Sequence, residues 1–227
     1  MTSFLFPPPA PSVVTIAGGG LFPVRRIFCV GQNYAAHARE MGTDPAREKP
    51  VFFTKPADAV TQQTDIPFPS ATTNLHYEGE LVIALGKGGT AIPAERALDC
   101  VFGYAAGCDL TRRDIQAAAK AAGGPWDMAK GFDLSAILSD IAPASAIGHP
   151  AQGRLTTTVN GQIRQDADLA DMIWGCADII AFLSGYVALA AGDLIYTGTP
   201  AGVGALVRGD KTEIAISGIG VCRFSVV

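Results

Sequence analysis

The sequence predicts an α+β protein that is mainly β, with a large antiparallel or mixed sheet and a few short helices. Short apolar runs bounded by Gly or Pro recur along the chain, and they have the length of strands. The helical patterns are few and do not alternate regularly with these strands, which argues against a doubly wound fold. A chain of 227 residues, 48% of them hydrophobic and 17% charged, is long enough for one sizeable core.

The Pro- and Gly-rich residues 1–22 predict an extended N-terminal arm, which leaves residues 23–227 as a single domain. In LTTTVNGQIRQ, the pair Asn160-Gly161 predicts a hairpin closed by a type I′ turn. The remaining predicted strands are apolar and end in glycine or proline turns; they cover 25–31, 51–56, 80–89, 101–110, 193–198, 212–217 and 221–227.

Two segments predict the longer helices. Residues 111–124 give the clearer pattern, because Thr111 and Asp114 have the spacing of a capping box and Gly123 is a suitable stop. Residues 177–193 predict a second helix with an apolar face. The sequence shows no internal repeat.

Charge and composition exclude several classes of function. The net charge is −4 and no Lys/Arg run is present, so nucleic acid and anionic lipid are not expected partners. No apolar stretch reaches the ~18–20 residues that span a bilayer, and the Pro-rich N-terminus lacks the features of a signal peptide. We expect the cysteines to be buried thiols in a reducing compartment, the cytoplasm, because none of them has CxxC spacing. The five are Cys29, Cys100, Cys108, Cys176 and Cys222.

Three carboxylates make a candidate metal site. Glu78 and Glu80 are two residues apart at the start of a strand, so they share one face, and Asp109 ends another apolar strand. Oxygen ligands without paired Cys or His favour a hard cation, Mg²⁺ or Mn²⁺, with Ca²⁺ as an alternative. Glu-x-Glu alone is more often merely solvated, and Asp114 competes as the third ligand unless it caps its helix. His76 is a candidate to support a ligand.

His37 and Glu40 lie three residues apart on a short predicted helix, which Asn33 would cap and Gly42 would close. This spacing puts both side chains on one helix face. A carboxylate beside a histidine fixes its tautomer and raises its basicity, which suits a general base that activates water. A solvated surface pair is the commoner outcome for this spacing alone.

Two lysines and a glycine-rich turn are further candidates. Lys55 and Lys130 each stand alone among apolar residues, where they could hold a substrate carboxylate or enolate, or extend to solvent. Arg113 and Gln116 follow Asp109 on the predicted helix, where an exposed face is the simpler interpretation. Backbone N–H groups in GTPAGVG, residues 198–204, could cradle an anion, although a tight turn also needs such glycines.

Together these segments resemble the fumarylacetoacetate hydrolase family, and within it the short fumarylpyruvate hydrolases. The resemblance runs from about Arg25 to the C-terminus, so it covers nearly the whole chain. It is carried by VGQNYAAHAREMG, VFFTKPADAV, NLHYEGELVIALGK, GYAAGCDLTRRDIQ, GPWDMAKGFD, VNGQIRQ and GDLIYTGTPAGVG. The resemblance implies the family's mixed β-sandwich roll with short helices at the rim, usually assembled as a homodimer.

The resemblance also implies roles for particular residues. It places the metal on Glu78, Glu80 and Asp109 and the water-activating pair, His37 and Glu40, on a mobile helix that covers the site. Lys130 is expected to be catalytic. The expected substrate contacts are Lys55 of the FxKP motif, Arg113, Gln116, and Thr199 of the TGTP loop, which would hold a pyruvoyl carboxylate. Gln32 departs from the pattern, because many relatives have arginine there.

The function implied is hydrolysis of the carbon–carbon bond of a 2,4-diketo acid, with fumarylpyruvate as the preferred substrate and fumarate and pyruvate as products. The metal would act as Lewis acid and template for the 1-carboxylate and 2-oxo group. Water activated by His37 and Glu40 would attack the 4-oxo carbonyl, and Lys130 would stabilise the leaving enolate. Oxaloacetate decarboxylation or isomerisation of a 2-oxo acid are alternatives on the same scaffold, and a non-catalytic carboxylate-binding protein is another.

Overall fold

The computed structural model describes residues 4–40 and 49–227. Its centre is a mixed eight-stranded sheet with the order β4-β3-β15-β8-β9-β11-β5, in which β12 also pairs with β9. The pairs β15–β3 and β11–β5 are parallel, and the other pairs are antiparallel. The strands are β3 (Arg26–Gly31), β4 (Val51–Lys55), β5 (Val60–Thr61), β8 (Gly79–Leu85), β9 (Val101–Asp109), β11 (Ala136–Leu138), β12 (Ala142–Pro143) and β15 (Asp193–Tyr196).

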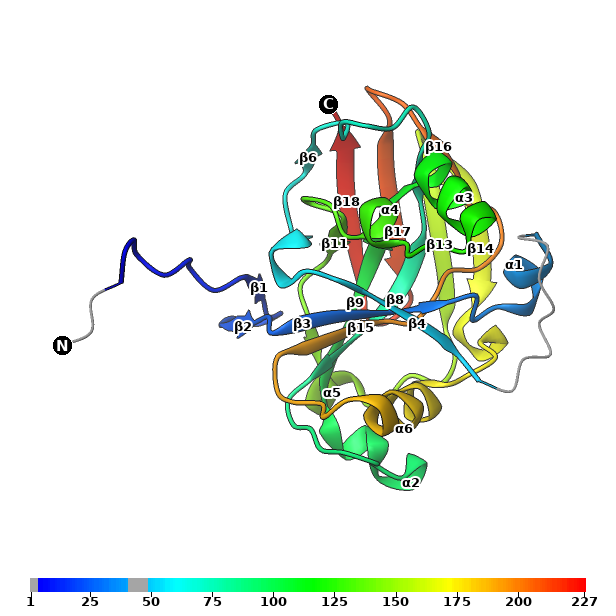
Figure 1. Ribbon diagram of the computed structural model, residues 1–227. Coiled ribbons are helices and arrows are strands. Elements are labelled where there is room, and N and C mark those ends of the chain that lie inside the picture. Colours follow the sequence, from blue (N-terminus) through cyan, green and yellow to red (C-terminus); the bar gives the residue numbers. More distant parts are fainter. Residues whose placement is uncertain (1–3, 41–48) are drawn as a thin grey trace.

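A second sheet packs across this one (Figure 1), and strands β13, β17 and β18 contact β8 or β9. Its five strands have the order β14-β13-β17-β18-β6, and a small sheet of order β10-β7-β16 lies beside them. The bounds are β6 (Asp65–Ile66), β7 (Leu75–Tyr77), β10 (Thr111–Arg112), β13 (Arg154–Val159), β14 (Gln162–Asp168), β16 (Gly204–Leu206), β17 (Lys211–Ile216) and β18 (Gly220–Val226). The predicted mainly β sandwich with a mixed sheet is therefore confirmed.

Strand β8 is buried on both faces, which explains its continuous apolar sequence. Leu81 and Ile83 point into the core between the two sheets. Val82 and Ala84, on the opposite face, belong to a second cluster that includes Tyr196 of β15. Because residues alternate between the faces of a strand, one uninterrupted apolar run supplies both cores.

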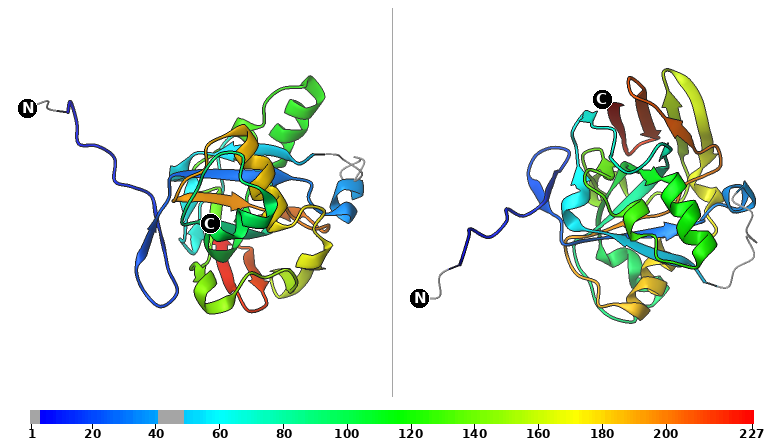
Figure 2. Two further views of the ribbon diagram at one scale, coloured as in Figure 1. Left: turned by 90° about the horizontal axis from the view of Figure 1, so that it is seen from below. Right: turned by 45° about the horizontal axis from the view of Figure 1, so that its top comes forward.

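The helices are short and lie around the sheets (Figures 1 and 2). They are α1 (Ala35–Glu40), α2 (Ala94–Ala97), α3 (Arg113–Ala122), α4 (Asp127–Lys130), α5 (Ala144–Ile147) and α6 (Cys176–Tyr186), with 3₁₀ turns η1 (Ala57–Ala59), η2 (Leu98–Cys100) and η3 (Leu169–Asp171). Within the described residues, no helix is long and apolar enough to cross a membrane.

The predicted N-terminal arm divides into two parts. Residues 4–12 extend away from the body of the molecule, on the side opposite α1 (Figures 1 and 2). Residues 13–23 then form a hairpin of β1 (Val13–Thr15) and β2 (Leu21–Pro23), which anchors the arm because Val14 and Phe22 enter the second apolar cluster.

Two turn signals in the sequence are confirmed. Gly123 ends α3 in the left-handed conformation, at φ 64°. Asn160 and Gly161 both have positive φ, 53° and 77°, between the antiparallel strands β13 and β14, as a type I′ turn requires.

The second long helix is shorter than predicted. It ends at Tyr186, because Val187 is extended at φ −140° and Leu189 forms a bridge with Gly89. Gly192 then turns the chain into β15 with φ 91°, where a Cβ would lie 2.7 Å from the Pro23 carbonyl oxygen. Tertiary pairing therefore overrides the apolar pattern over residues 187–193.

The capping box predicted for Thr111 and Asp114 is wrong. Arg112 is the N-cap of α3 and makes no side-chain cap, while Thr111 lies on β10. The Asp114 carboxylate accepts hydrogen bonds from the Thr72 hydroxyl (2.6 Å) and the Thr73 amide (2.9 Å). Asp114 thus ties the loop before β7 to the helix, and it takes no part in the cluster of carboxylates described next.

Candidate active site

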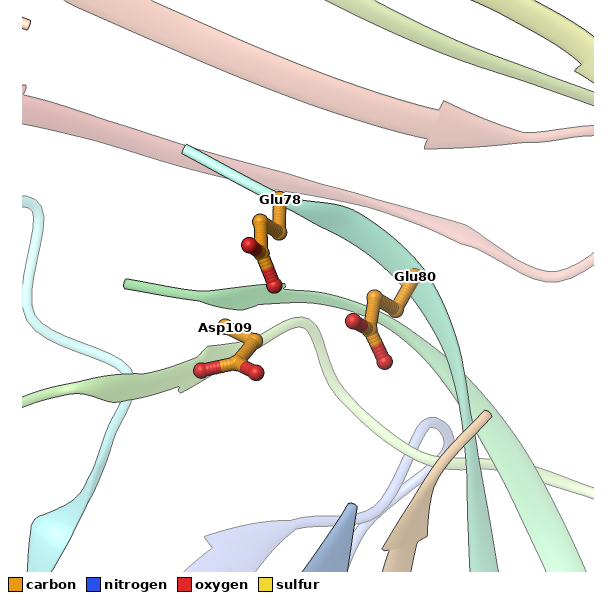
Figure 3. Close-up of side chains that lie close together, drawn as sticks. All are labelled: Glu78, Glu80 and Asp109. Carbon is orange, nitrogen blue, oxygen red and sulfur yellow. The ribbon is translucent and has the colours of Figure 1, made fainter. Parts of the chain in front are cut away.

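Glu78, Glu80 and Asp109 form an acidic triad between β8 and β9, and all three are buried. One oxygen from each side chain lies within 4.8 Å of the others. Figure 3 shows the three side chains gathered in one place. The register of the two strands brings them together, because Gly79 pairs with Cys108 and the Asp109 amide donates to the Glu78 carbonyl at 2.9 Å. The predicted shared face of Glu78 and Glu80 is therefore observed.

The residue between the two glutamates has to be glycine. A Cβ on Gly79 would lie 2.2 Å from Thr157 Oγ1 and 3.1 Å from Gln165 Oε1, well inside van der Waals contact. The second sheet thus packs directly against the backbone that carries the triad, which fixes the positions of both glutamates.

Gln165 is a site residue that the sequence reasoning missed. Its buried amide accepts from the Gly79 N–H at 3.0 Å and donates to Thr199 Oγ1 at 2.7 Å and to the Pro200 carbonyl at 2.9 Å. It therefore ties β8 to the loop after β15. Its place in VNGQIRQ puts it on the predicted hairpin, but nothing in the local pattern marks it as a site residue.

The two candidate lysines are buried against the triad, so the alternative that they extend to solvent is wrong. Lys130 Nζ donates to Glu78 (2.6 Å), Asp109 (2.7 Å) and the Thr111 hydroxyl (2.6 Å). Lys55 Nζ pairs with the other Asp109 oxygen at 2.8 Å and also donates to the Lys130 carbonyl. Both ammonium groups therefore hold protein carboxylates in place.

Arg113 and Gln116 form the third side of the site, rather than an exposed helix face. Arg113 pairs with Glu78 at 2.5 Å and donates to the Gln116 side chain at 2.6 Å. Its Nε also approaches His76 Nδ1 at 3.4 Å. Burial and the Arg113 charge lower the pKa of His76 to about 4, so this histidine stays neutral and accepts from the arginine.

The three carboxylates differ in their electrostatic surroundings. Burial opposes ionisation of Glu78, but the Lys130 and Arg113 charges outweigh it and hold the pKa well below its usual range. Burial and the charges of Asp109 and Glu78 raise the pKa of Glu80 well above its usual range. Glu80 receives one hydrogen bond, from the Gly198 N–H at 2.7 Å, and has no ion pair among the described residues. A divalent cation bound at Glu80 would supply the missing positive charge, so the triad fits such an ion.

His37 and Glu40 contact each other on α1, as their spacing predicted. His37 Nδ1 lies 2.9 Å from Glu40 Oε2, and the histidine is only 4% exposed, so the alternative of a solvated surface pair is wrong. The carboxylate selects the tautomer with the proton on Nδ1, which leaves Nε2 as the basic nitrogen. The Gly202 N–H donates to both Glu40 oxygens at 3.3 Å and holds the pair from the other side.

Asn33 anchors the start of α1, but it does not cap the helix as predicted. Its amide donates to the carbonyls of Trp174 (2.9 Å) and Thr197 (2.8 Å), and its carbonyl accepts from the Trp174 N–H at 2.8 Å. Gly42, the predicted end of the helix, lies outside the described residues.

The glycine-rich loop at 198–204 donates its N–H groups to carboxylates, as the sequence suggested for an anion. The acceptors are side chains of the protein itself, Glu80 from Gly198 and Glu40 from Gly202. The Thr199 hydroxyl donates to the Gly79 carbonyl at 2.9 Å. This loop therefore joins the triad to the His37–Glu40 pair.

A small cavity of about 20 Å³ lies where these groups meet, which is room for one water or ion. The predicted residues on its wall are His37, Glu78, Glu80, Arg113, Gln116, Lys130 and Thr199. Three predicted residues lie behind this wall and contact residues that line it. Glu40 contacts His37, Asp109 is ion-paired with Lys130, and Lys55 donates to the Lys130 carbonyl. Residues without a predicted role also line it, among them Gln32, Phe53, Lys120 and Trp126. Gln32 has φ 65°, a conformation that residues other than glycine seldom adopt.

Comparison with known proteins identifies the family. The family model for the fumarylacetoacetate (FAA) hydrolase C-terminal domain matches residues 26–227. The chain belongs to the fumarylacetoacetate hydrolase family. The predicted resemblance is confirmed, and most of the sequence segments that carry it supply residues to the cavity wall.

Members of the family with two different activities are similarly close to this chain. It is 42% identical over 203 residues to the mitochondrial oxaloacetate tautomerase FAHD1 of Mus musculus, which covers 89% of this chain and 91% of that protein. It is also 42% identical over 184 residues to a fumarylpyruvate hydrolase of a Ralstonia species, which covers 81% of this chain and 95% of that protein.

A solved structure agrees with the whole fold. The fumarylpyruvate hydrolase of Pseudomonas aeruginosa, crystallised in complex with Mn²⁺ and pyruvate, superposes with a TM-score of 0.97 and 49% identity. The superposition covers 99% of each chain. The short fumarylpyruvate hydrolases are therefore among the relatives of this protein, as the sequence predicted.

Proposed function

We propose that the protein hydrolyses the carbon–carbon bond of an acylpyruvate, with fumarylpyruvate as the preferred substrate and fumarate and pyruvate as the products. The observation that carries this proposal is the buried His37, which is hydrogen-bonded to Glu40 and lines the same cavity as Glu78 and Glu80 of the acidic triad. A general base for water has a purpose in hydrolysis, and the fumarylpyruvate hydrolases among the relatives support this choice of substrate.

We propose Glu78, Glu80 and Asp109 as the ligands of Mg²⁺ or Mn²⁺, with Ca²⁺ as an alternative. Their buried oxygens and the uncompensated charge of Glu80 support this assignment, as does the Mn²⁺ in the Pseudomonas relative. A bound divalent ion would polarise the 2-oxo group of the substrate and offset negative charge that develops on it. The remaining steps fall to the side chains of the chain itself.

The His37–Glu40 pair would carry the proton transfers. Glu40 holds the Nδ1 proton, so Nε2 can take a proton from water while the water oxygen attacks the 4-oxo carbonyl. The bond between C3 and C4 then breaks, and its electron pair passes into the pyruvate enolate. The proton that Nε2 took from water then passes to C3 and gives pyruvate, and the acyl group leaves as fumarate. The buried Lys130 ammonium is close enough to the triad to stabilise the enolate charge.

The other predicted contacts take more specific roles. Arg113 and Gln116 line the cavity and would orient the pyruvoyl part of the substrate. The Thr199 hydroxyl already donates its proton to Gly79, so we propose the Thr199 backbone N–H as the donor to the substrate carboxylate. Lys55 lies behind the wall on Asp109, and we propose that it positions that ligand instead of touching substrate.

Oxaloacetate tautomerisation is the second candidate, favoured by the tautomerase relative of the same 42% identity. This reaction moves a proton between C3 and the enol oxygen and consumes no water. The triad, Lys130 and one base would serve it, so the cavity alone suits both reactions. Hydrolysis differs in its need for a positioned water molecule beside His37.

Purified protein with Mg²⁺ or Mn²⁺ should be tested on fumarylpyruvate, acetylpyruvate and oxaloacetate. The proposal expects stoichiometric fumarate and pyruvate from fumarylpyruvate, with kcat/KM well above that for enol-to-keto conversion or decarboxylation of oxaloacetate. If oxaloacetate tautomerisation is faster than fumarylpyruvate hydrolysis and fumarate release is negligible, the proposed function is oxaloacetate tautomerisation and not hydrolysis. Binding without turnover of any substrate would favour a non-catalytic carboxylate-binding protein.

We also propose a homodimer. Phe4, Leu5 and Phe6 are 70–96% exposed at the end of the projecting arm, and a second copy of the chain could cover them. Light scattering should give twice the mass of the 23.5 kDa chain. A monomer at micromolar concentration would contradict this assignment.

A further inference from the structure

We propose that the side-chain amide of Gln32 binds the attacking water together with His37. Gln32 is then a further catalytic residue, because it contacts a reactant. This role depends on the proposed hydrolysis of an acylpyruvate, and it gives the water of that reaction a second contact with the protein.

Gln32 lies between the central sheet and α1, and its neighbours on both sides are fixed. Gly31, at the end of β3, pairs with Val51 of β4. The Asn33 amide donates to two backbone carbonyls, at 2.9 and 2.8 Å. The position of Gln32 is therefore set by the sheet and by the anchor at Asn33, whereas His37 lies one turn into α1.

The backbone of Gln32 has an unusual conformation in a buried place. Its φ is 65°, and a residue other than glycine keeps such a conformation only where the surrounding structure holds it. Gln32 lines the inner cavity and is only 9% exposed. A strained backbone that presents a buried polar residue to a cavity is typical of a functional site.

The Gln32 amide has unused hydrogen-bonding capacity. It carries two donor hydrogens and an acceptor oxygen, but it makes no hydrogen bond to any residue within 4–40 or 49–227. A polar group that is buried to this extent and left without a partner costs free energy. A molecule in the cavity therefore has to supply the partner.

Most other acceptors on the cavity wall are already engaged. Glu78 is paired with Lys130 and Arg113. Gln116 Oε1 accepts from Arg113 at 2.6 Å. Glu80 is the proposed metal ligand with no ion pair among the described residues. None of these three side chains is therefore available to hold a water molecule beside His37.

The remaining groups on the wall leave Gln32 as the acceptor. The Thr199 hydroxyl accepts from Gln165 at 2.7 Å and donates to the Gly79 carbonyl at 2.9 Å. Lysine and arginine side chains donate hydrogen bonds and accept none. Among the described side chains that line the cavity, the Gln32 amide oxygen thus remains as the partner of His37 in binding water.

The hydrolysis needs such a second acceptor. A water that attacks the 4-oxo carbonyl has to point an oxygen lone pair at C4, so both of its protons have to be held elsewhere. His37 Nε2 removes the first proton as the water oxygen bonds to C4. Gln32 Oε1 accepts a hydrogen bond from the second proton, which stays on that oxygen and leaves with the new carboxyl group.

Replacement of Gln32 by Met keeps the length of the side chain and removes its hydrogen bonds. For Gln32→Met we expect kcat for fumarylpyruvate to fall about tenfold, as for the loss of one hydrogen bond. KM, and the affinity of the Mn²⁺-loaded protein for oxalate, should stay unchanged, because neither involves the water. Gln63→Met is the matched control, since Gln63 is exposed and does not line the cavity.

Gln32→Asn tests the same contact without strain in the backbone. Asparagine adopts positive φ more readily than other residues with a side chain, so this variant should fold at least as well as the wild type. Its amide is one methylene shorter and cannot reach the water. We expect the same loss of kcat as in Gln32→Met, and full activity in Gln32→Asn would overturn the contact.

Coupling to His37 separates a contact with water from a structural role. Two groups that hold one water act as a unit, so adding Gln32→Met to His37→Ala should lower kcat by less than about twofold. If Gln32 only supports the fold, the loss should be about tenfold in both backgrounds, and this result would overturn the inference.

A crystal structure with Mn²⁺ and oxalate shows the contact directly. We expect one ordered water within about 2.6–3.2 Å of both His37 Nε2 and Gln32 Oε1 in the wild type, and its loss in Gln32→Met. A Gln32 amide bonded to oxalate itself would overturn the inference. Wild-type hydrolysis that Gln32→Met leaves unchanged would overturn the water contact alone, whereas absence of hydrolysis in the wild type would overturn the proposed function.

Discussion

The acidic triad and the His37–Glu40 pair face the same cavity, but they are built on very different supports. Glu78, Glu80 and Asp109 are 0–5% exposed and lie on or beside two central strands, which are hydrogen-bonded on both sides. The pair lies on α1, a helix of six residues at the margin of the molecule (Figure 1). The Glu40 side chain is 37% exposed.

The supports match the tasks that we propose for each group. Ligands of a metal have to be held rigidly before the ion binds, and buried strands with lysine and arginine partners provide that rigidity. A base that closes over the substrate has to move away again, and a short helix with few buried contacts opens at low free-energy cost. The difference predicts that changes in the two regions will have separable effects.

Glu80→Gln should have the largest effect, because it removes the carboxylate that has no ion pair among the described residues while keeping its shape. We expect activity on every substrate to fall by about 10³-fold or more, since metal-assisted charge stabilisation supplies several kcal/mol. Mg²⁺ and Mn²⁺ binding, measured by calorimetry, should be lost.

The stability of the same variant sharpens this test. Burial raises the pKa of Glu80, so the charged form is unfavourable in the metal-free protein. Glu80→Gln should therefore keep or raise the metal-free Tm and lose the rise in Tm on adding metal. Full activity or wild-type metal affinity in this variant would remove Glu80 from the metal site.

His37→Ala and Glu40→Gln should have the next largest effect, confined to the reaction that needs water. Loss of a general base costs about 10²–10⁴-fold, so hydrolysis of fumarylpyruvate should fall by that factor. Decarboxylation of oxaloacetate, if the wild type shows any, should fall much less, and metal affinity should stay unchanged. Survival of hydrolysis in Glu40→Gln with loss of oxaloacetate chemistry would show that the pair does not activate water.

Local periodicity predicted most of the strands and the turns correctly. Apolar runs gave β3, β4, β8, β9, β15, β17 and β18 within a few residues, and Asn160-Gly161 gave its turn. The errors arose where a distant partner decides the structure. Residues 187–193 leave the helix, and Leu189 pairs with Gly89 instead. Asp114 accepts from Thr72 and Thr73 of a distant loop as well as from Ile115 of its own helix.

Spacing gave the candidate residues of the site but not their contacts. The pair His37 and Glu40 follows from one helix turn, whereas the burial of Lys55 and Lys130 depends on strands and helices far apart in the chain. Gln165 could not be found by periodicity, because its partners Gly79 and Thr199 are 86 and 34 residues away in sequence. Family resemblance supplied the grouping that local patterns could not.

Gly79→Ala should test the support of the triad with a moderate effect. The added Cβ would lie 2.2 Å from Thr157 Oγ1, so β8 or β13 has to shift. Overpacking of this kind costs about 1–3 kcal/mol of unfolding free energy, measured by urea denaturation, and it should lower metal affinity as well.

Two further variants make this test specific. Thr157→Ala removes the oxygen that clashes with the added Cβ. The double variant Gly79→Ala/Thr157→Ala should therefore recover part of the unfolding free energy that Gly79→Ala alone loses. Gly185→Ala on α6 is the matched control, since a Cβ there has nothing within 4 Å and should stabilise the helix by about 0.5–1 kcal/mol. Equal effects of alanine at both glycines would show that close packing at Gly79 does not support the triad.

The smallest effect should be a change in the mobility of α1 without any mutation. The predicted mobile helix ran from Tyr34 to Met41; α1 begins at Ala35, and Met41 lies outside the described residues. A cavity of about 20 Å³ is smaller than an acylpyruvate, so part of its wall has to move. We expect this part to be α1, a helix of six residues at the margin of the molecule that carries His37. Oxalate can present to the metal a pair of oxygens like the carboxylate and 2-oxo oxygens of a pyruvoyl group. Together with Mg²⁺ it should therefore occupy the site as substrate would and hold α1 closed.

Hydrogen exchange can detect this difference between the two regions of the site. We expect the amides of α1, including that of Ala38, which donates to the Tyr34 carbonyl at 2.9 Å, to exchange several-fold more slowly with Mg²⁺ and oxalate than without. Amides of the buried strands β8 and β9 should already be protected in both states and should change little. The order of protection follows from burial, because strand amides need wide opening to exchange whereas one helix turn can open alone. If α1 is equally protected with and without oxalate, the helix does not move, and substrate has to enter past another wall.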